Sequence, residues 1–170
     1  MMPSRWPHSF LFFGFGALLA LPLAAPARAA DLRVVIEDIS APAGTIVAGL
    51  YDNAEGFRQA VREPSKFVVN DAKRVAGASL RPTGSTQTVV FADLRPGLYA
   101  VIVIHDENND GQMNRGMLGQ PLEPYGISNN PRTLVAPPDF AAAAVRLGER
   151  DEVIRITLVD PRGGPSGAPR

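Results

Sequence analysis

The most informative stretch of this sequence is Phe91-Ala92-Asp93-Leu94-Arg95-Pro96-Gly97-Leu98-Tyr99-Ala100-Val101-Ile102-Val103-Ile104-His105. Its Pro-Gly pair predicts a tight turn between two strands, because both residues favour turns. The residues after the turn are almost all apolar, which is typical of a central strand covered on both faces. Side chains alternate along a strand, so His105 and Asp106 are expected to point to opposite faces where this strand ends.

The remainder of the chain after residue 30 has the pattern of short strands separated by turn residues. Strands are predicted at Leu32–Ile39, Thr45–Tyr51, Arg74–Leu80, Thr86–Phe91, Leu98–His105, Ala143–Leu147 and Val153–Val159. The first two are spaced as a hairpin, and a short helical turn is predicted at Phe57–Val61. This pattern indicates an all-β fold, a single antiparallel, immunoglobulin-like β-sandwich of about seven strands with one long irregular loop.

The N-terminal residues have the pattern of a secretory signal peptide. Arg5 precedes an apolar run from Phe10 to Leu23, and the run ends in small residues that include Ala27 and Ala29. Cleavage is predicted after Ala29, which makes residues 1–29 a signal peptide and places the protein in the periplasm or outside the cell. No later segment is long and apolar enough to span a bilayer.

Composition excludes several kinds of site. The 170 residues fit one domain, predicted at residues 30–160, and contain no cysteine, so disulfides, thiolate metal sites and a cysteine nucleophile are excluded. Without residues 1–29 the chain carries 15 basic and 17 acidic side chains and one histidine, His105. This balance gives no reason to expect nucleic acid or an anionic membrane to be attracted by charge. Residues 161–170 are predicted to form a disordered tail.

A cation-binding pattern follows the central strand directly. Asp106, Asn108 and Asp110 stand at alternate positions and Gly111 comes next, as in the first half of a calcium loop. Further candidate ligands are the backbone carbonyl of Gln112 and the side chain of Asn114. The twelfth position holds Met117 instead of glutamate, and no helices flank the loop, so an EF-hand is excluded. Turn formation without a metal explains the same residues, because Asp, Asn and Gly are common in tight turns.

The loop continues into an irregular segment that ends near Asp139 and is long for a compact domain. Glu123 could supply the missing carboxylate if this segment folds back onto the calcium-type loop. A candidate binding surface comprises His105, Glu123, Tyr125, Ser128, Asn129 and Asn130. The alternative is that these residues hold an ordered cap over the edge of the sandwich.

Two resemblances follow from these motifs. The pattern Leu-x-Pro-Gly-x-Tyr from Leu94 to Tyr99 resembles a hairpin of transthyretin-like and Cna-B-like sandwiches. Together with the Asp106–Asn114 loop and the stretch Gly119–Asn130, the chain from about Leu32 to Val159 closely resembles a secreted bacterial family, domain of unknown function 2141. Ile127 stands where that family usually has phenylalanine. The resemblance implies a periplasmic or secreted β-sandwich and implies no activity.

Three functions are compatible with the sequence. The first is a binding or interaction module for an envelope protein or small ligand, with calcium as the candidate cofactor. The second is a small-ligand carrier of the transthyretin type, which rests on fold analogy. The third is a hydrolase that combines Ser128 and His105 with Asp106 or Glu123, but no Gly-x-Ser-x-Gly motif surrounds the serine. A single histidine is also too few for a typical catalytic zinc site. We therefore expect a non-enzymatic protein with no catalytic residues.

Overall fold

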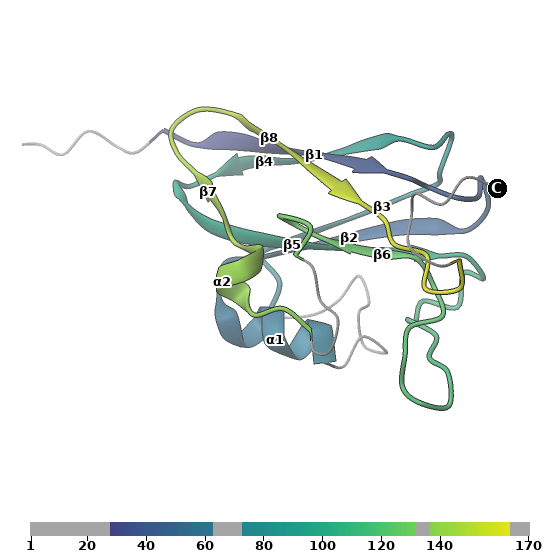
Figure 1. Ribbon diagram of the computed structural model, residues 1–170. Coiled ribbons are helices and arrows are strands. Elements are labelled where there is room, and N and C mark those ends of the chain that lie inside the picture. The colour runs from purple at the N-terminus through teal and green to yellow at the C-terminus, as the bar shows by residue number, and fades with distance from the viewer. Residues whose placement is uncertain (1–27, 63–72, 132–136, 164–170) are drawn as a thin grey trace, which may run out of the picture.

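Two β-sheets packed face to face form the body of the protein in the computed structural model (Figure 1), which confirms the predicted all-β sandwich. The structure describes residues 28–62, 73–131 and 137–163. Residues 1–27 of the predicted signal peptide and residues 164–170 of the predicted tail lie outside the described residues. Within the described part of the chain, no helix has the length and apolar character needed to cross a membrane.

The smaller sheet has three strands, β4 (Gln87–Leu94), β1 (Ala30–Glu37) and β8 (Glu152–Thr157), in that order. The larger sheet contains β3 (Ala76–Leu80), β2 (Thr45–Tyr51), β5 (Gly97–Asp106) and β6 (Tyr125–Ile127), and β7 (Val145–Leu147) also pairs with β5. All neighbouring strands are antiparallel except β1 and β8, which run parallel.

The predicted hairpin between the first two strands is wrong, because β1 and β2 belong to different sheets. The turn at Pro96-Gly97 likewise leads from β4 in one sheet to β5 in the other, instead of forming a hairpin. Both crossings occur because each strand buries an apolar face between the sheets and finds its hydrogen-bond partners elsewhere in its own sheet. The crossing from β4 to β5 is stabilised by the Tyr99 hydroxyl, which donates to the Arg95 carbonyl at 2.8 Å, as in a tyrosine corner.

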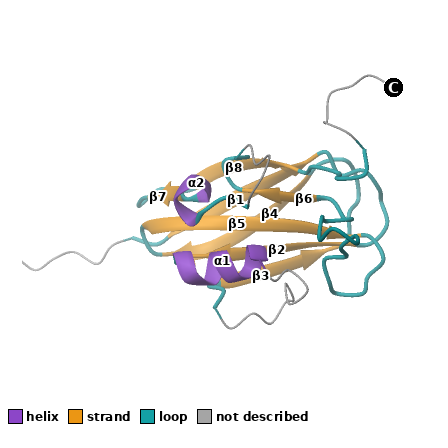
Figure 2. Ribbon diagram, turned by 60° about the horizontal axis from the view of Figure 1, so that its bottom comes forward, coloured by secondary structure: helices purple, strands orange, loops and turns teal. Residues whose placement is uncertain are grey.

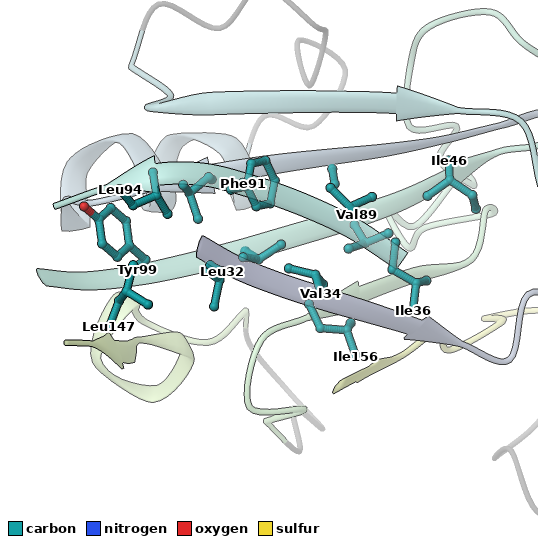
Figure 3. Close-up of a cluster of buried hydrophobic side chains, with 14 of the residues drawn as sticks. Leu32, Val34, Ile36, Ile46, Val89, Phe91, Leu94, Tyr99, Leu147 and Ile156 are labelled. Atoms are coloured by element: carbon teal, nitrogen blue, oxygen red, sulfur yellow. The ribbon is translucent and has the colours of Figure 1, made fainter. Parts of the chain in front are cut away.

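Strand β5 is covered on both faces, as its apolar sequence predicts. Every residue from Tyr99 to Asp106 is buried. Between the sheets, β5 contributes Tyr99, Val101 and Val103 to a core that also contains Leu32, Val34, Ile36, Phe91 and Ile156 (Figure 3). On the opposite face, Ala100, Ile102 and Ile104 pack in a second cluster with Phe57 and Ala143.

Two helices cover the outer face of the larger sheet (Figure 2). Helix α1 (Ala54–Arg62) includes the predicted turn Phe57–Val61, and its start is fixed by the Asn53 side chain, which accepts a hydrogen bond from Gly56 N at 2.8 Å. Phe57 contacts Tyr51 and Phe140 edge-on, and Phe140 begins the short helix α2 (Phe140–Ala143). The contacts hold α2 against α1.

The segment predicted to be irregular, residues 106–139, contains strand β6, which pairs with β5. Strand β6 is only three residues long and has a glycine in its centre, so its sequence does not resemble a strand. A Cβ on Gly126 would lie 2.5 Å from Ile156 Cγ2 of β8. Glycine is therefore required where the two sheets approach each other closely.

Candidate functional site

The calcium-type loop begins at the last residue of β5 and lies at one end of the sandwich (Figure 1). Asp106 is 5% exposed, and both of its carboxylate oxygens accept backbone hydrogen bonds, from Asp110 N at 3.2 Å and Gly111 N at 2.8 Å. The chain can curl in this way because Asn109 and Gly111 have positive φ angles of 60° and 74°. Gly111, which follows the three alternating polar residues, therefore lies at a sharp turn of the loop.

Asp110 is the centre of a second set of contacts within the loop. Its Oδ1 accepts from Gln112 N at 2.8 Å, and its Oδ2 accepts from the amides of Asn108 and Asn114 at 2.9 and 3.0 Å. The hydrogen bonds from Asn108 and Asn114 lower the pKa of Asp110, with a smaller contribution from Gln112 N. Asp110 is thus held as a carboxylate, with the candidate ligands Asn108 and Asn114 beside it.

Glu123 closes the loop from a distant position in the sequence. Its Oε1 accepts from Glu107 N and its Oε2 from Asn114 N, both at 3.1 Å, so the long segment folds back as the sequence suggested. Glu123 is 4% exposed, and burial is the main cause of its raised pKa. The two backbone donors lower the pKa, while the negative charges of Asp106 and Asp110 raise it. Three of the predicted ligands are therefore close enough for their charges to interact.

The charge around this group of carboxylates is unbalanced. Arg162, beside the loop, pairs with Glu107 at 2.7 Å and with Asp160 at 3.0 Å. Within residues 28–62, 73–131 and 137–163, Asp106, Asp110 and Glu123 form no ion pair with a basic side chain. Two buried carboxylates and one exposed carboxylate thus share a small region with backbone and amide donors as their only described partners.

A metal bound by side chains of acidic residues and histidine alone is not favoured by this geometry. Among the described residues, no group of three or more His, Asp or Glu side chains is arranged to hold a metal ion. A cation at the loop would need amide and backbone oxygens in addition to carboxylates. Calcium accepts such mixed oxygen ligands, whereas typical catalytic zinc sites use nitrogen and sulfur.

The loop between β1 and β2 supports the site, although nothing in the local sequence pattern indicated this. Thr45 Oγ1 donates to Asn109 Oδ1 at 2.6 Å. A Cβ on Gly44 would lie 2.3 Å from the Asp106 carbonyl oxygen, so the two loops touch through their backbones. These contacts depend on β2 pairing with β5, which places Thr45 opposite Asp106. Only this long-range register brings the residues together.

His105 does not join the loop carboxylates through a hydrogen bond. It is fully buried, and its Nε2 lies 2.7 Å from the Ala43 carbonyl oxygen. A carbonyl can only accept, so Nε2 carries a proton in this contact. Nδ1 is buried without a hydrogen-bond partner among the described residues. The His105 side chain contacts the Ala43 carbonyl, whereas the Asp106 side chain contacts its own loop. These contacts agree with the prediction that the two side chains point to opposite faces.

Ser128 occupies a gap in the larger sheet. Along β5, strand β6 pairs with residues 102–104 and strand β7 with residues 97–99. Between them, Ser128 accepts a hydrogen bond from Val101 N at 2.9 Å through its hydroxyl, and its own N donates to the Val101 carbonyl at 2.9 Å. The hydroxyl donates to the Ala143 carbonyl at 2.6 Å. The side chain is fully buried, and its hydrogen bonds link β5 to the end of α2.

Asn129 and Asn130 make backbone contacts similar to those of Ser128. Asn129 donates to the carbonyls of Ala142 and Ala144, at 3.2 and 3.0 Å. Asn130 donates to Arg155 O at 3.0 Å and accepts from Thr157 N at 2.9 Å, so it pairs with the edge of β8. Both asparagines have positive φ angles, 65° and 44°. These contacts agree with the alternative that the segment forms an ordered cap over a sheet edge.

Tyr125 completes the candidate binding surface predicted from sequence. It is half-buried, and its backbone pairs with Val159 through hydrogen bonds of 3.1 and 2.8 Å. The structure therefore separates the six predicted residues, because His105 and Tyr125 contact the backbone of Ala43 and Val159. Glu123 lies at the calcium-type loop, whereas Ser128, Asn129 and Asn130 connect strands and helix.

Comparison with known proteins gives one match. Residues 34–155 match the model of a family described as "Uncharacterized protein conserved in bacteria (DUF2141)". No curated protein and no solved structure matches the chain.

Proposed function

Because the chain belongs to the DUF2141 family of uncharacterised bacterial proteins, we propose its function from its geometry: a secreted or periplasmic, non-enzymatic binding module with a weak calcium site. The site comprises the Asp106–Asn114 loop and Glu123. The observation that carries this proposal is the cluster of Asp106, Asp110 and Glu123, which has no basic partner among the described residues.

A bound cation would relieve two unfavourable features of this cluster. Burial of a carboxylate without a counter-charge is costly, and two of the three carboxylates are buried. Their mutual repulsion also contributes to the raised pKa of Glu123. Calcium would compete with the amide protons of Asn108 and Asn114 at Asp110 Oδ2. Turning those amides over would replace nitrogen by oxygen, which is a suitable calcium ligand.

The non-enzymatic part of the proposal is supported by the environments of Ser128 and His105. The serine hydroxyl donates to one backbone carbonyl and accepts from one backbone N–H, and the histidine Nε2 donates to another carbonyl. A nucleophile and its general base need a hydrogen bond between them, and none joins these two in the described residues. Turnover of an ester, peptide or glycoside that is lost in His105→Ala would contradict this part.

Thermal unfolding tests the calcium site. The chain without its predicted signal peptide is heated in excess calcium and in excess chelator. For a dissociation constant of about 1 mM, as in extracellular modules, calcium at tenfold excess adds RT ln 11, or about 1.4 kcal/mol. This corresponds to a rise in Tm of roughly 5 °C for a domain of this size.

Two variants assign the calcium effect to the loop. Asp110→Asn keeps an acceptor for Gln112 N but removes a charge, so the calcium-dependent rise in Tm should disappear. Glu149→Gln removes a charge from an exposed turn elsewhere and should keep the full rise. Superimposable unfolding curves of the parent in calcium and chelator would refute the site, as would an unchanged calcium effect in Asp110→Asn.

A further inference from the structure

An ordered turn projects from the connection between β5 and β6, away from both sheets (Figure 1). At its base, Leu122 N donates to the Asn114 carbonyl, and Gly116 N donates to the Gln120 carbonyl, each at 2.9 Å. Gly119 N then donates to Gly116 O at 2.9 Å, which closes a β-turn. The two central residues of this turn are Met117 and Leu118, here named the apolar tip.

The apolar tip is more exposed than any other large hydrophobic residue in the described part of the chain. Met117 is 104% exposed and Leu118 is 93% exposed, whereas Val153, the next in order, is 55% exposed. The turn that carries the tip is held by further contacts. Leu118 N donates to Gln120 Oε1 at 3.1 Å, and the Arg115 guanidinium donates to the Gly119 carbonyl. A hydrogen-bonded turn thus exposes two neighbouring apolar side chains to solvent. Exposed apolar side chains that lie together are a feature of interaction sites.

The shape of the tip favours a lipid surface over a folded protein partner. A specific protein interface buries about 800 Å² on each partner, and two side chains on a narrow turn provide much less. A bilayer needs no matching surface, because its interface accepts convex apolar groups of any shape. Half-exposed Leu122 follows at the base of the turn, and residues 113–122 contain no acidic side chain that would oppose entry into lipid.

We propose that the apolar tip inserts into the interfacial region of a lipid bilayer and anchors the protein to a membrane surface. The insertion is carried by apolar side chains, so it agrees with an overall charge that offers no strong electrostatic attraction. It should therefore persist when salt is raised, unlike adsorption by charge. The apolar tip is separate from the proposed calcium site, although the turn that carries it begins at Asn114, the last residue of the calcium-type loop.

Site-specific fluorescence tests the insertion directly. The chain has no cysteine, so Met117→Cys creates a single attachment point for an environment-sensitive fluorophore, and Val153→Cys gives a matched exposed position on β8. Both labelled proteins are mixed with vesicles of phosphatidylethanolamine and phosphatidylglycerol, in calcium and in chelator. The emission of the label at 117 should shift to the blue on vesicle addition, and the label at 153 should not change.

Sedimentation with the same vesicles measures affinity without a label. The double variant Met117→Ser/Leu118→Ser should bind vesicles at least about tenfold more weakly than the parent, because most of the inserted apolar surface is lost. Its Tm should equal that of the parent, since the replaced side chains are exposed. Val153→Ser should bind as the parent does.

Three results would overturn the proposal. The first is a parent protein that fails to sediment with vesicles both in calcium and in chelator. The second is equal sedimentation of the parent and the tip double variant. The third is tip-dependent binding to another protein without any binding to vesicles. Each differs from failure of the calcium site, which is judged by the calcium-dependent change in Tm in the absence of lipid.

Discussion

Replacing Ser128 by alanine removes a hydroxyl that serves two buried backbone groups at once. Val101 N would lose its acceptor, and the Ala143 carbonyl would lose its donor. Residues 101, 128 and 143 are all fully buried, so water cannot easily replace the hydroxyl. Each unsatisfied buried group costs about 1–3 kcal/mol, and some relaxation is expected, so the free energy of unfolding should fall by roughly 2–4 kcal/mol.

This loss would be a large part of the total stability, because domains of this size unfold with about 5–15 kcal/mol. Urea unfolding followed by circular dichroism measures it, as a lower midpoint with an unchanged m-value. Amide hydrogen exchange gives a local readout, since Val101 N should exchange faster in the variant than in the parent. The expected fall in Tm is roughly 10 °C.

Ser79→Ala is the matched control, because Ser79 is exposed on the edge strand β3. Its effect should stay within about 0.5 kcal/mol. A loss of unfolding free energy in Ser128→Ala no larger than that in Ser79→Ala would contradict this role of Ser128. A small cost would mean that the two backbone groups find other partners, and Ser128 would then not be the residue that closes the gap between β6 and β7.

The contacts of Tyr99, Glu123 and Asp110 give three further predictions. Tyr99→Phe removes the hydrogen bond to Arg95 O and should lower the unfolding free energy, measured in urea, by about 1 kcal/mol. Tyr125→Phe is the control and should have a smaller effect, because the Tyr125 hydroxyl has no partner among the described residues. Equal losses in the two variants would contradict a stabilising role of the Tyr99 hydrogen bond. The raised pKa of Glu123 means that the folded protein binds its proton more tightly than the unfolded chain does, so the contribution of Glu123 to stability should increase as the pH falls from 7 through the folded pKa toward 4.5. The unfolding free energy of the parent minus that of Glu123→Gln should therefore rise as the pH falls from 7 toward 4.5, and a constant difference would contradict the shift. The lowered pKa of Asp110 acts in a separate window, because its stabilisation is lost only as the pH falls below 3.8.

Much of the candidate site is local in sequence and was predictable for that reason. Alternating Asp106, Asn108 and Asp110 with Gly111 formed a curled loop because side-chain oxygens can reach backbone N–H groups a few residues away. The sequence could suggest Glu123 as a ligand but could not predict its contacts, because Glu123 lies nine residues or more from its two backbone partners. The contact from Thr45 to Asn109 had no signal in the sequence, since it depends on the register of β2 against β5.

The roles of Ser128, Asn129 and Asn130 show a different difficulty. Polar residues in a long loop have the same pattern whether they face a ligand or bind the protein backbone. Which of these occurs depends on where β6 ends and where β7 and β8 lie, and those strands are short or distant in the chain. Met117 and Leu118 pose the converse problem, because apolar residues in a loop are usually expected to pack, and only the projecting turn leaves them exposed.

The residue pattern predicts the strand-rich sandwich, the buried character of β5, the short helix after β2 and the curl of the Asp106 loop. Each of these depends on periodicity, turn residues or hydrogen bonds between near neighbours. Long-range packing places β1 and β2 in opposite sheets and makes β8 run parallel to β1. It also brings Glu123 to the loop and places Ser128 in a gap in the sheet. These features could not be predicted because strand pairing and the burial of polar groups depend on residues far apart in the chain, and the local pattern carries no information about the partner.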